Sequence, residues 1–188
     1  AVQAMAGHIP VIGMIEPAAA AALAHTRTGH IGVMATFGTV RSAAYAHAIH
    51  QRSPEAVVSS VACQMLVALA EEGWVEGDIP RAVLHRYLDP MFDRSDAPDT
   101  LILGCTHFPV FADVLHDMLG SSVTLINSGE AAARYLGPYV ESAPNPELRP
   151  SHSFWVTDDP ARFAESAIKF FDHRLSESAI SLIDITPS

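Results

Sequence analysis

Residues 100–109 carry the clearest structural pattern and read Thr100-Leu101-Ile102-Leu103-Gly104-Cys105-Thr106-His107-Phe108-Pro109. Thr100–Gly104 is a short apolar run of strand length. Gly104 allows a tight turn after this run, and Pro109 suits the first turn of a helix. A helix is predicted over Val110–Leu119, and Gly120 is expected to end it. The stretch therefore predicts a buried strand, a polar turn and a helix.

The same alternation of strands and helices extends in both directions along the chain. Further strands are predicted over Pro10–Ile15, His30–Ala35, Val57–Ala62, Val123–Ile126 and Ser153–Thr157. Helices are predicted over Ala18–Ala24, Leu66–Glu72, Arg81–Leu88, Ser128–Leu136 and Ala161–Phe171. Gly73 is expected to end the second of these helices, and a further helix is expected to begin with Thr39–Tyr45. Pro17 is expected to prevent the first strand from continuing as a helix. Asp158-Asp159-Pro160 provides a cap and a first-turn proline for the last helix.

This order predicts an α/β fold with a parallel sheet and helices on both faces. In such sheets, functional groups collect at the carboxyl ends of the strands. The polar turns Thr36–Thr39 and Cys105–His107 are expected at that edge. Residues 137–150 contain four prolines and few apolar side chains, which predicts a linker.

Composition limits the classes of function. The chain has 188 residues, of which 49% are hydrophobic, so it can bury a sizeable core. Its formal net charge is −10, and Lys169 is the only lysine, so nucleic acid is a poor partner. No apolar run approaches the ~20 residues that cross a bilayer, and we expect no membrane association. The two cysteines, Cys63 and Cys105, cannot form a disulfide framework and favour a cytoplasmic location.

Clustered histidines can bind metal ions. His47 and His50 lie three residues apart, and His25 and His30 lie five apart, without cysteines or carboxylates arranged around them. A zinc site needs about three or four convergent ligands. We therefore expect these histidines to be solvated and the chain to bind no metal.

Cys105 is the strongest candidate for chemistry. A cysteine at the start of a helix lies at the positive end of the helix dipole, which favours the thiolate. His107 could stabilise that thiolate or transfer protons, and Thr106 could donate hydrogen bonds to an anion. The alternative, equally weighted on this pattern alone, is that Cys105 is an inert core residue. For Cys63 the inert interpretation is favoured, because no base stands beside it.

Five segments together resemble the glutamate racemases of the aspartate/glutamate racemase superfamily, in the same order and spacing. Leu101–Pro109 resembles the second cysteine motif of that family, and Ala35–Ser42 resembles its substrate-contacting threonine turn. The other three are Pro10–Pro17, the acidic helix from Ala62 to Gly73, and Ile126–Ala131, where the family usually carries Asp in place of Asn127. The resemblance covers essentially the whole chain.

The resemblance implies cofactor-independent racemisation of L- and D-glutamate by two cysteines, one on each side of the α-carbon. Cys105 would be one of them, assisted by His107. Thr36, Thr39 and Thr106 would bind the amino and carboxylate groups of glutamate. Glu71 matches a carboxylate that supports the histidine, although a solvated helix carboxylate is an equally good interpretation of the residue itself. The product D-glutamate would supply peptidoglycan synthesis, and a homodimer is one arrangement that the family suggests.

The resemblance also implies a domain organisation. One complete α/β domain would span residues 16–137, and residues 1–15 would end a first, similar domain that is present only in part. Residues 138–188 would form a linker and a return to that first domain. The family's Cys-Asn-Thr-Ala segment does not occur in the chain, and Cys63 lies in a different motif. We therefore expect the chain to lack an amino-terminal segment and to be inactive alone.

Other functions remain open from the sequence. Aspartate racemases share the architecture but usually carry Glu where His107 stands, which favours the glutamate branch. A decarboxylase of the same superfamily needs a single cysteine, and Cys105 could serve. A racemase-like binding module without activity is the third alternative.

Overall fold

The computed structural model describes residues 6–8, 10–141, 152–171, 175 and 179–185. The chain divides into two compact units, residues 1–141 and 142–188, and each is described here by itself. The expected domain boundary after residue 15, and the assignment of residues 138–188 to the same domain as residues 1–15, stay predictions.

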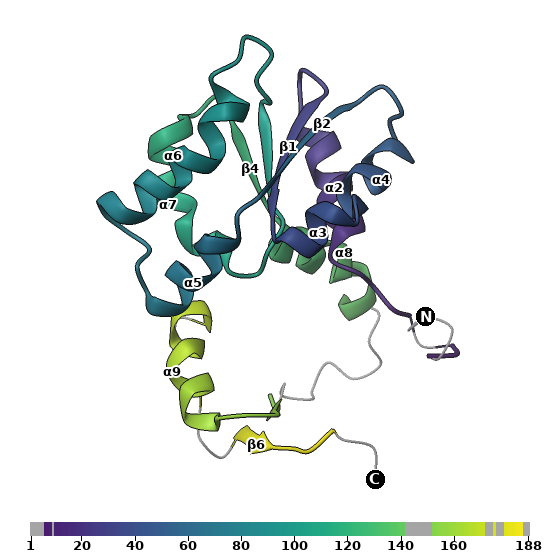
Figure 1. Cartoon of the computed structure of the whole chain (residues 1–188). Helices are drawn as coiled ribbons and strands as arrows, with labels where there is room; N and C mark the ends of the chain where they lie inside the picture. The colour runs from purple at the N-terminus through teal and green to yellow at the C-terminus, as the bar shows by residue number, and fades with distance from the viewer. Residues whose placement is uncertain (1–5, 9, 142–151, 172–174, 176–178, 186–188) are drawn as a thin grey trace. The chain divides into compact units, whose positions relative to one another are not determined.

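A four-stranded parallel sheet forms the centre of the first unit (Figure 1). Its strands lie in the order β2 (Val57–Ala62), β1 (His30–Ala35), β3 (Thr100–Leu103) and β4 (Thr124–Asn127). All three neighbouring pairs are parallel. The predicted ranges of β1 and β2 match the structure, and those of β3 and β4 match to within one residue at each end. The predicted α/β class is confirmed.

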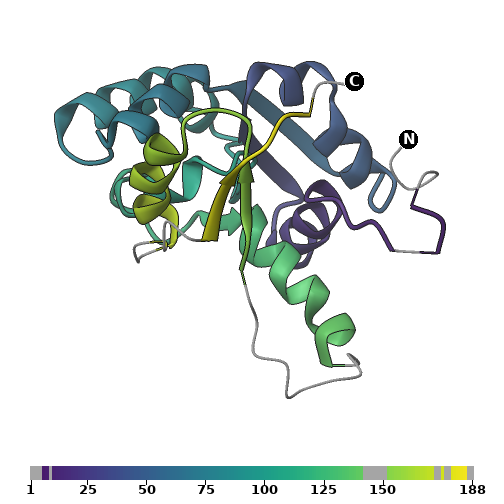
Figure 2. The ribbon, with the colours of Figure 1, turned by 90° about the horizontal axis from the view of Figure 1, so that it is seen from below.

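Helices cover both faces of this sheet (Figure 1, and from below in Figure 2). One face packs against α5 (Gln64–Glu72), α6 (Asp78–Phe92), the 3-10 helix η1 (Phe108–Phe111) and α7 (Ala112–Leu119). The other packs against α2 (Ile15–His25), α4 (Ala44–His50) and α8 (Ser128–Glu141). Side chains of β3 alternate between the two cores: Leu101 and Leu103 enter the first, and Ile102 enters the second. All three are at most 1% exposed, as expected for a strand covered on both sides.

The predicted strand over Pro10–Ile15 is wrong. Residues 10–14 have no regular secondary structure, and α2 begins at Ile15. Pro17 lies in the first turn of this helix, where the missing N–H has no intrahelical partner to lose. It therefore permits the helix that it was expected to prevent.

Several helix boundaries also differ from the prediction. Helix α6 is longer than the predicted Arg81–Leu88, and the predicted helix over Val110–Leu119 is divided between η1 and α7. The helix expected from Thr39 onward is two helices, α3 (Phe37–Arg41) and α4, so Thr39 lies inside α3 and not in a turn. They are separated at Ala43, whose φ of 51° is left-handed. Helix α8 continues through Pro138 to Glu141, so residues 137–141 are not linker. The rest of the predicted linker, residues 142–150, lies outside the described residues.

The second unit contains a parallel strand pair joined by a helix. Strand β5 (Phe154–Val156) pairs with β6 (Ile180–Leu182), and α9 (Pro160–Phe171) lies between them in sequence. Asp159 caps α9 as predicted, because its Oδ1 accepts hydrogen bonds from the N–H groups of Ala161 and Arg162. The Phe154 ring packs on Phe163 and Phe171 at centroid distances of 5.8 and 5.7 Å. Over the described parts of both units, none of the helices combines the length and the apolar character that crossing a membrane requires.

Candidate active site

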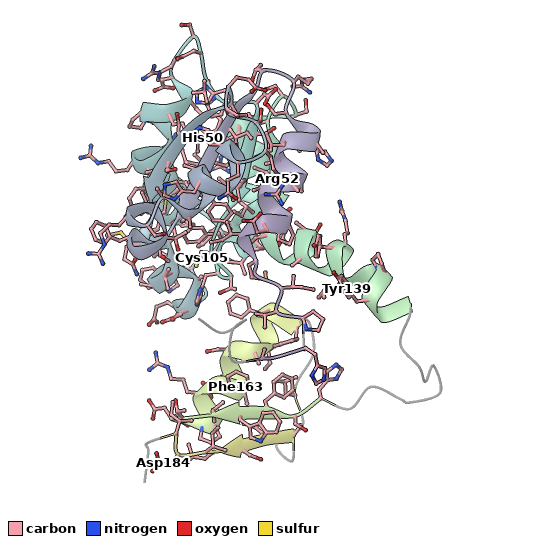
Figure 3. All side chains as sticks on the ribbon, turned by 90° about the vertical axis from the view of Figure 1, so that its right-hand side faces the viewer. His50, Arg52, Cys105, Tyr139, Phe163 and Asp184 are labelled. Carbon is pink, nitrogen blue, oxygen red and sulfur yellow. The ribbon has the colours of Figure 1, made fainter. Side chains whose placement is uncertain are left out.

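Cys105 lies two residues after the last residue of β3, at the carboxyl end of the sheet (Figure 3). The amide of Gly104 still donates to the Met34 carbonyl at 2.8 Å, so the strand pairing continues until one residue before the thiol. Next comes the short turn that leads into η1, where Phe108 is fully buried. The thiol is thus held between a paired strand and a buried aromatic anchor, yet Cys105 itself stays partly exposed.

His107 and Glu71 extend from Cys105 in a row. The Cys105 Sγ lies 3.7 Å from Nδ1 of His107, within hydrogen-bonding range for sulfur. On the other side of the ring, Nε2 of His107 lies 3.5 Å from Oε1 of Glu71. Glu71 comes from the last turn of α5, so two separate elements build this row. The side chains of His107 and Glu71 are 26% and 48% exposed, which leaves the row open to solvent on one side.

The predicted threonines lie at the same edge. Thr36 follows β1, and its Oγ1 lies 3.2 Å from Oγ1 of Thr39. Strand β1 neighbours β3 in a register that pairs Met34 with Leu103, so Thr36 and Cys105 follow at corresponding positions. Adjacent strands are about 4.8 Å apart. Thr106 is exposed on the turn beside Cys105. The structure thus gathers the predicted site residues at one edge of the sheet.

Cys63 has a contrasting environment. It follows β2 at the same edge, but it is fully buried in the core beneath α5 and α6. Burial raises the pKa of the Cys63 thiol to about 12. A thiol with this pKa carries almost no thiolate near neutral pH, which supports the inert interpretation made from its sequence context.

Two polar residues near Cys105 were not singled out from the sequence. Tyr45 on α4 and Ser128 at the start of α8 are each 4% exposed. The Ser128 hydroxyl donates to the Leu103 carbonyl at 2.9 Å, two residues before Cys105. Ser128 lies within the Ile126–Ala131 segment, but its contact with the Leu103 carbonyl, like the position of Tyr45, depends on how α4 and α8 pack beside β3.

The described residues contain no group of three or more histidines, cysteines and carboxylates that could hold a metal ion.

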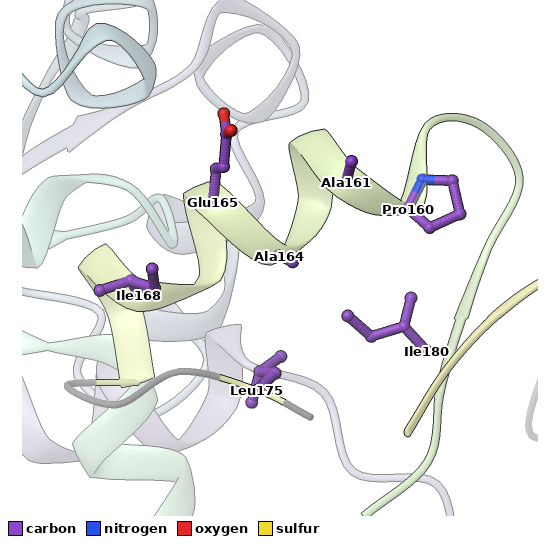
Figure 4. A pocket seen from close by; sticks show the side chains of 7 residues that line it. All are labelled: Pro160, Ala161, Ala164, Glu165, Ile168, Leu175 and Ile180. Carbon is purple, nitrogen blue, oxygen red and sulfur yellow. The ribbon is translucent and has the colours of Figure 1, made fainter. Parts of the chain in front are cut away.

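A separate pocket lies beside α9 (Figure 4). It is lined by Pro160, Ala161, Ala164, Glu165, Ile168, Leu175 and Ile180. The Glu165 carboxylate points away from Leu175 and Ile180 in Figure 4. All seven residues belong to the second unit, so this pocket contains none of the predicted site residues.

The fold and the site together define an α/β domain that presents a thiol, an imidazole and a carboxylate at the carboxyl edge of its parallel sheet. Residues 1–136 match the model of the Asp/Glu/Hydantoin racemase family, and the chain belongs to this family.

Curated relatives and solved structures agree with this assignment. The chain is 39% identical over 174 residues to a glutamate racemase of Geobacter metallireducens, covering 90% of this chain and 63% of that protein. It is 39% identical to one of Syntrophus aciditrophicus, covering 89% of this chain and 62% of that protein. The chain thus spans less than two thirds of the length of these relatives.

Among solved structures, a glutamate racemase isoform of Bacillus anthracis superposes with a TM-score of 0.86 at 31% identity, over 98% of this chain and 69% of that one. A glutamate racemase of Francisella tularensis in complex with D-glutamate also gives 0.86, at 30% identity and covering 98% and 68%. The similarity of these folds confirms the resemblance that the sequence motifs indicated.

Proposed function

We propose that this chain supplies one catalytic side of a cofactor-independent glutamate racemase, in which Cys105 removes or returns the α-proton of glutamate. The row of Cys105, His107 and Glu71 at the carboxyl edge of the sheet is the observation that carries this proposal. The glutamate racemases among the relatives, one of them solved with D-glutamate, support the choice of substrate.

The geometry of the row suits proton transfer. As a thiolate, Cys105 acts as the base toward one enantiomer, and as a thiol it acts as the acid toward the other. His107 is close enough to exchange a proton with the sulfur, at 3.7 Å. Glu71, 3.5 Å from the other ring nitrogen, stabilises the imidazolium that this exchange creates. General acid–base catalysis of this kind typically contributes about 10²–10⁴-fold in rate.

The threonines provide neutral donors for the substrate. Thr36 and Thr39 present two hydroxyls 3.2 Å apart, and Thr106 adds a hydroxyl beside the thiol. Neutral hydroxyls can bind the amino and carboxylate groups without adding a charge that competes with the thiolate. Each hydrogen bond of this kind contributes about 0.5–1.5 kcal/mol.

Inversion requires a second thiol on the opposite face of the α-carbon. Cys63 cannot provide it, because its thiol is fully buried and its pKa is raised to about 12. We therefore propose that the second thiol lies in an upstream segment of the Cys-Asn-Thr-Ala type, and that the 188-residue chain is inactive alone. In the cell, the complete enzyme would work in the cytoplasm, as a homodimer or a monomer, and supply D-glutamate for peptidoglycan.

The test is exchange of the α-proton of L- and D-glutamate, with aspartate as the comparison substrate, in deuterated water. The 188-residue chain is compared with a longer protein, in which the same chain is preceded by the amino-terminal part of a glutamate racemase that contains the Cys-Asn-Thr-Ala segment. We expect exchange with inversion only in the longer protein. Racemisation by the shorter chain would overturn the two-thiol proposal, and exchange of aspartate but not glutamate would transfer the assignment to the aspartate racemases.

Variants of the longer protein then assign the residues. Cys105→Ser should abolish racemisation in both directions, because serine is a far weaker acid than cysteine. His107→Asn should slow turnover with a smaller effect on binding. Cys63→Ser is the matched control, since it removes the buried thiol and should leave exchange intact. Undiminished racemisation by Cys105→Ser would exclude Cys105 as a catalytic residue.

A further inference from the structure

Tyr45 occupies the space where a side chain at position 104 would stand. A Cβ added to Gly104 would lie 2.8 Å from Cε2 of the Tyr45 ring, closer than real Cβ contacts allow. It would also lie 3.1 Å from the Met34 carbonyl oxygen, which belongs to the neighbouring strand. The backbone just before Cys105 is therefore enclosed by β1 on one side and by the Tyr45 ring on another.

The hydroxyl end of Tyr45 belongs to a buried polar chain. Ser128 donates to the Leu103 carbonyl at 2.9 Å, and its hydroxyl is near enough to the Tyr45 hydroxyl to lower the pKa of that phenol. Burial raises the pKa of Tyr45, the Ser128 hydroxyl opposes this rise, and negative charge on Cys105 adds to it. A negative charge on Cys105 therefore disfavours ionisation of Tyr45 further.

The backbone before Tyr45 adopts a conformation that L-residues rarely take. Ala43, with a φ of 51°, is the only non-glycine residue with positive φ among those that the structure describes. A left-handed conformation costs roughly 1–3 kcal/mol outside glycine and persists where surrounding contacts fix it. Ala43 is the residue just before α4, two positions before Tyr45, whose ring lies against Gly104.

We propose that Tyr45 is a positioning residue for Cys105: its ring packs on Gly104, and its hydroxyl, through Ser128 and the Leu103 carbonyl, fixes the turn that holds the thiol beside His107. This inference rests on the proposed catalytic role of Cys105. It extends the site from the exposed row at the sheet edge to two buried residues on α4 and α8.

The experiment measures how fast iodoacetamide alkylates Cys105 in the 188-residue chain between pH 5 and 10, by peptide mass spectrometry. Cys63 in the same sample reports any opening of the core, because it is fully buried. Tyr45→Phe keeps the ring and removes the hydroxyl, and Ser128→Ala breaks the same chain at its next member. Tyr87→Phe is the matched control, since the Tyr87 hydroxyl accepts a hydrogen bond from the Met65 amide, at 3.4 Å, and lies on a different helix from Tyr45.

We expect Tyr45→Phe and Ser128→Ala each to slow Cys105 alkylation at neutral pH by about threefold or more, because the thiol loses its alignment with His107. The double variant should be no slower than the slower single variant, since both break one chain. His107→Asn alone should slow alkylation of Cys105 relative to the wild type. Added to Tyr45→Phe, it should cause little further slowing. Cys63 should remain unreacted throughout, and Tyr87→Phe should match the wild type.

Wild-type or faster alkylation of Cys105 in both single variants would overturn the inference. Slower alkylation accompanied by reaction of Cys63 would also overturn it, because the role of Tyr45 would then be structural. The assay contains no amino acid substrate. If the 188-residue chain shows these effects but the longer protein with the Cys-Asn-Thr-Ala segment does not exchange the α-proton of glutamate, the proposed function is refuted and the positioning role remains.

Discussion

Replacing Asp99 with asparagine should destabilise the fold, by an amount that follows from the hydrogen bonds and the pKa of this carboxyl. The residue precedes β3, its side chain is 8% exposed, and both carboxylate oxygens accept hydrogen bonds. Oδ1 accepts from the hydroxyls of Thr26 at 2.6 Å and Thr100 at 3.1 Å. Oδ2 accepts from the amides of Arg27 at 2.7 Å and Thr28 at 2.9 Å. This carboxylate therefore connects the loop before β1 to β3, the strand that leads to Cys105.

The size of the effect follows from the pKa of this carboxyl. Burial alone would raise the pKa of Asp99, but the hydrogen bonds from Thr26, Arg27, Thr28 and Thr100 outweigh it and lower the value to about 2. Against an ordinary value of about 3.9, the difference corresponds to about 2.5 kcal/mol of unfolding free energy at neutral pH. Because the folded-state pKa is the lower one, this contribution is complete above pH ~4 and is lost as the pH falls toward ~2. About half of it should remain at pH 3.

Urea unfolding followed by circular dichroism tests this reasoning. We expect Asp99→Asn to lower the free energy of unfolding at pH 7 by about 2–4 kcal/mol, because the amide NH₂ replaces an acceptor with a donor that faces other donors. The difference from wild type should shrink at pH 3. Asp96→Asn is the control, since Asp96 is exposed and paired with exposed Arg94, and it should have a much smaller effect. A wild-type stability of Asp99→Asn at pH 7, or a difference that does not change with pH, would refute the argument.

Three further predictions concern the candidate site. Gly104→Ala should destabilise the chain by about 1–3 kcal/mol in urea unfolding, because the new Cβ would lie 2.8 Å from the Tyr45 ring. In the native chain at pH 8, iodoacetamide should label Cys105 at least about a hundredfold faster than Cys63, whose burial raises the pKa of its thiol to about 12; comparable labelling would contradict the buried assignment. In the exchange-active protein, Thr36→Ala should weaken glutamate binding by about 1–2 kcal/mol, which is roughly five- to thirtyfold in calorimetry.

The sequence predicted the sheet best where local pattern and tertiary environment agree. His30–Ala35 is apolar, flanked by turn residues and buried along its whole length, so the pattern and the fold coincide. Pro10–Ile15 carries a similar pattern, yet a strand also needs a neighbouring backbone with which to pair. Residues 10–14 do not pair in the described sheets, and apolar character alone could not reveal this.

The residues of the candidate site differ in how far the sequence alone could predict their contacts. Cys105 and His107 are two residues apart on one turn, so their proximity could be predicted without the fold. Glu71 was suggested only by family resemblance, because its contact with His107 depends on how α5 packs against the sheet. The contacts of Tyr45 and Ser128 could not be predicted, since neither a tyrosine on one helix nor a serine at the start of another indicates that it will lie against the residues just before Cys105.

The register of the central sheet connects the core to the site. Side chains alternate between the two faces of a strand, so a shift of β3 by one residue would exchange the faces of all its side chains. Leu101 and Leu103 would then leave the core beneath α5 and α6, and Ile102 would leave the core beneath α2 and α4. Such a shift would place each side chain in the opposite core, which is packed around different side chains, and overpacking of a close-packed core typically costs about 1–3 kcal/mol. The same register sets Gly104 against Tyr45 and Cys105 beside the end of β1. The apolar core therefore determines where the thiol lies, although no core side chain takes part in its chemistry.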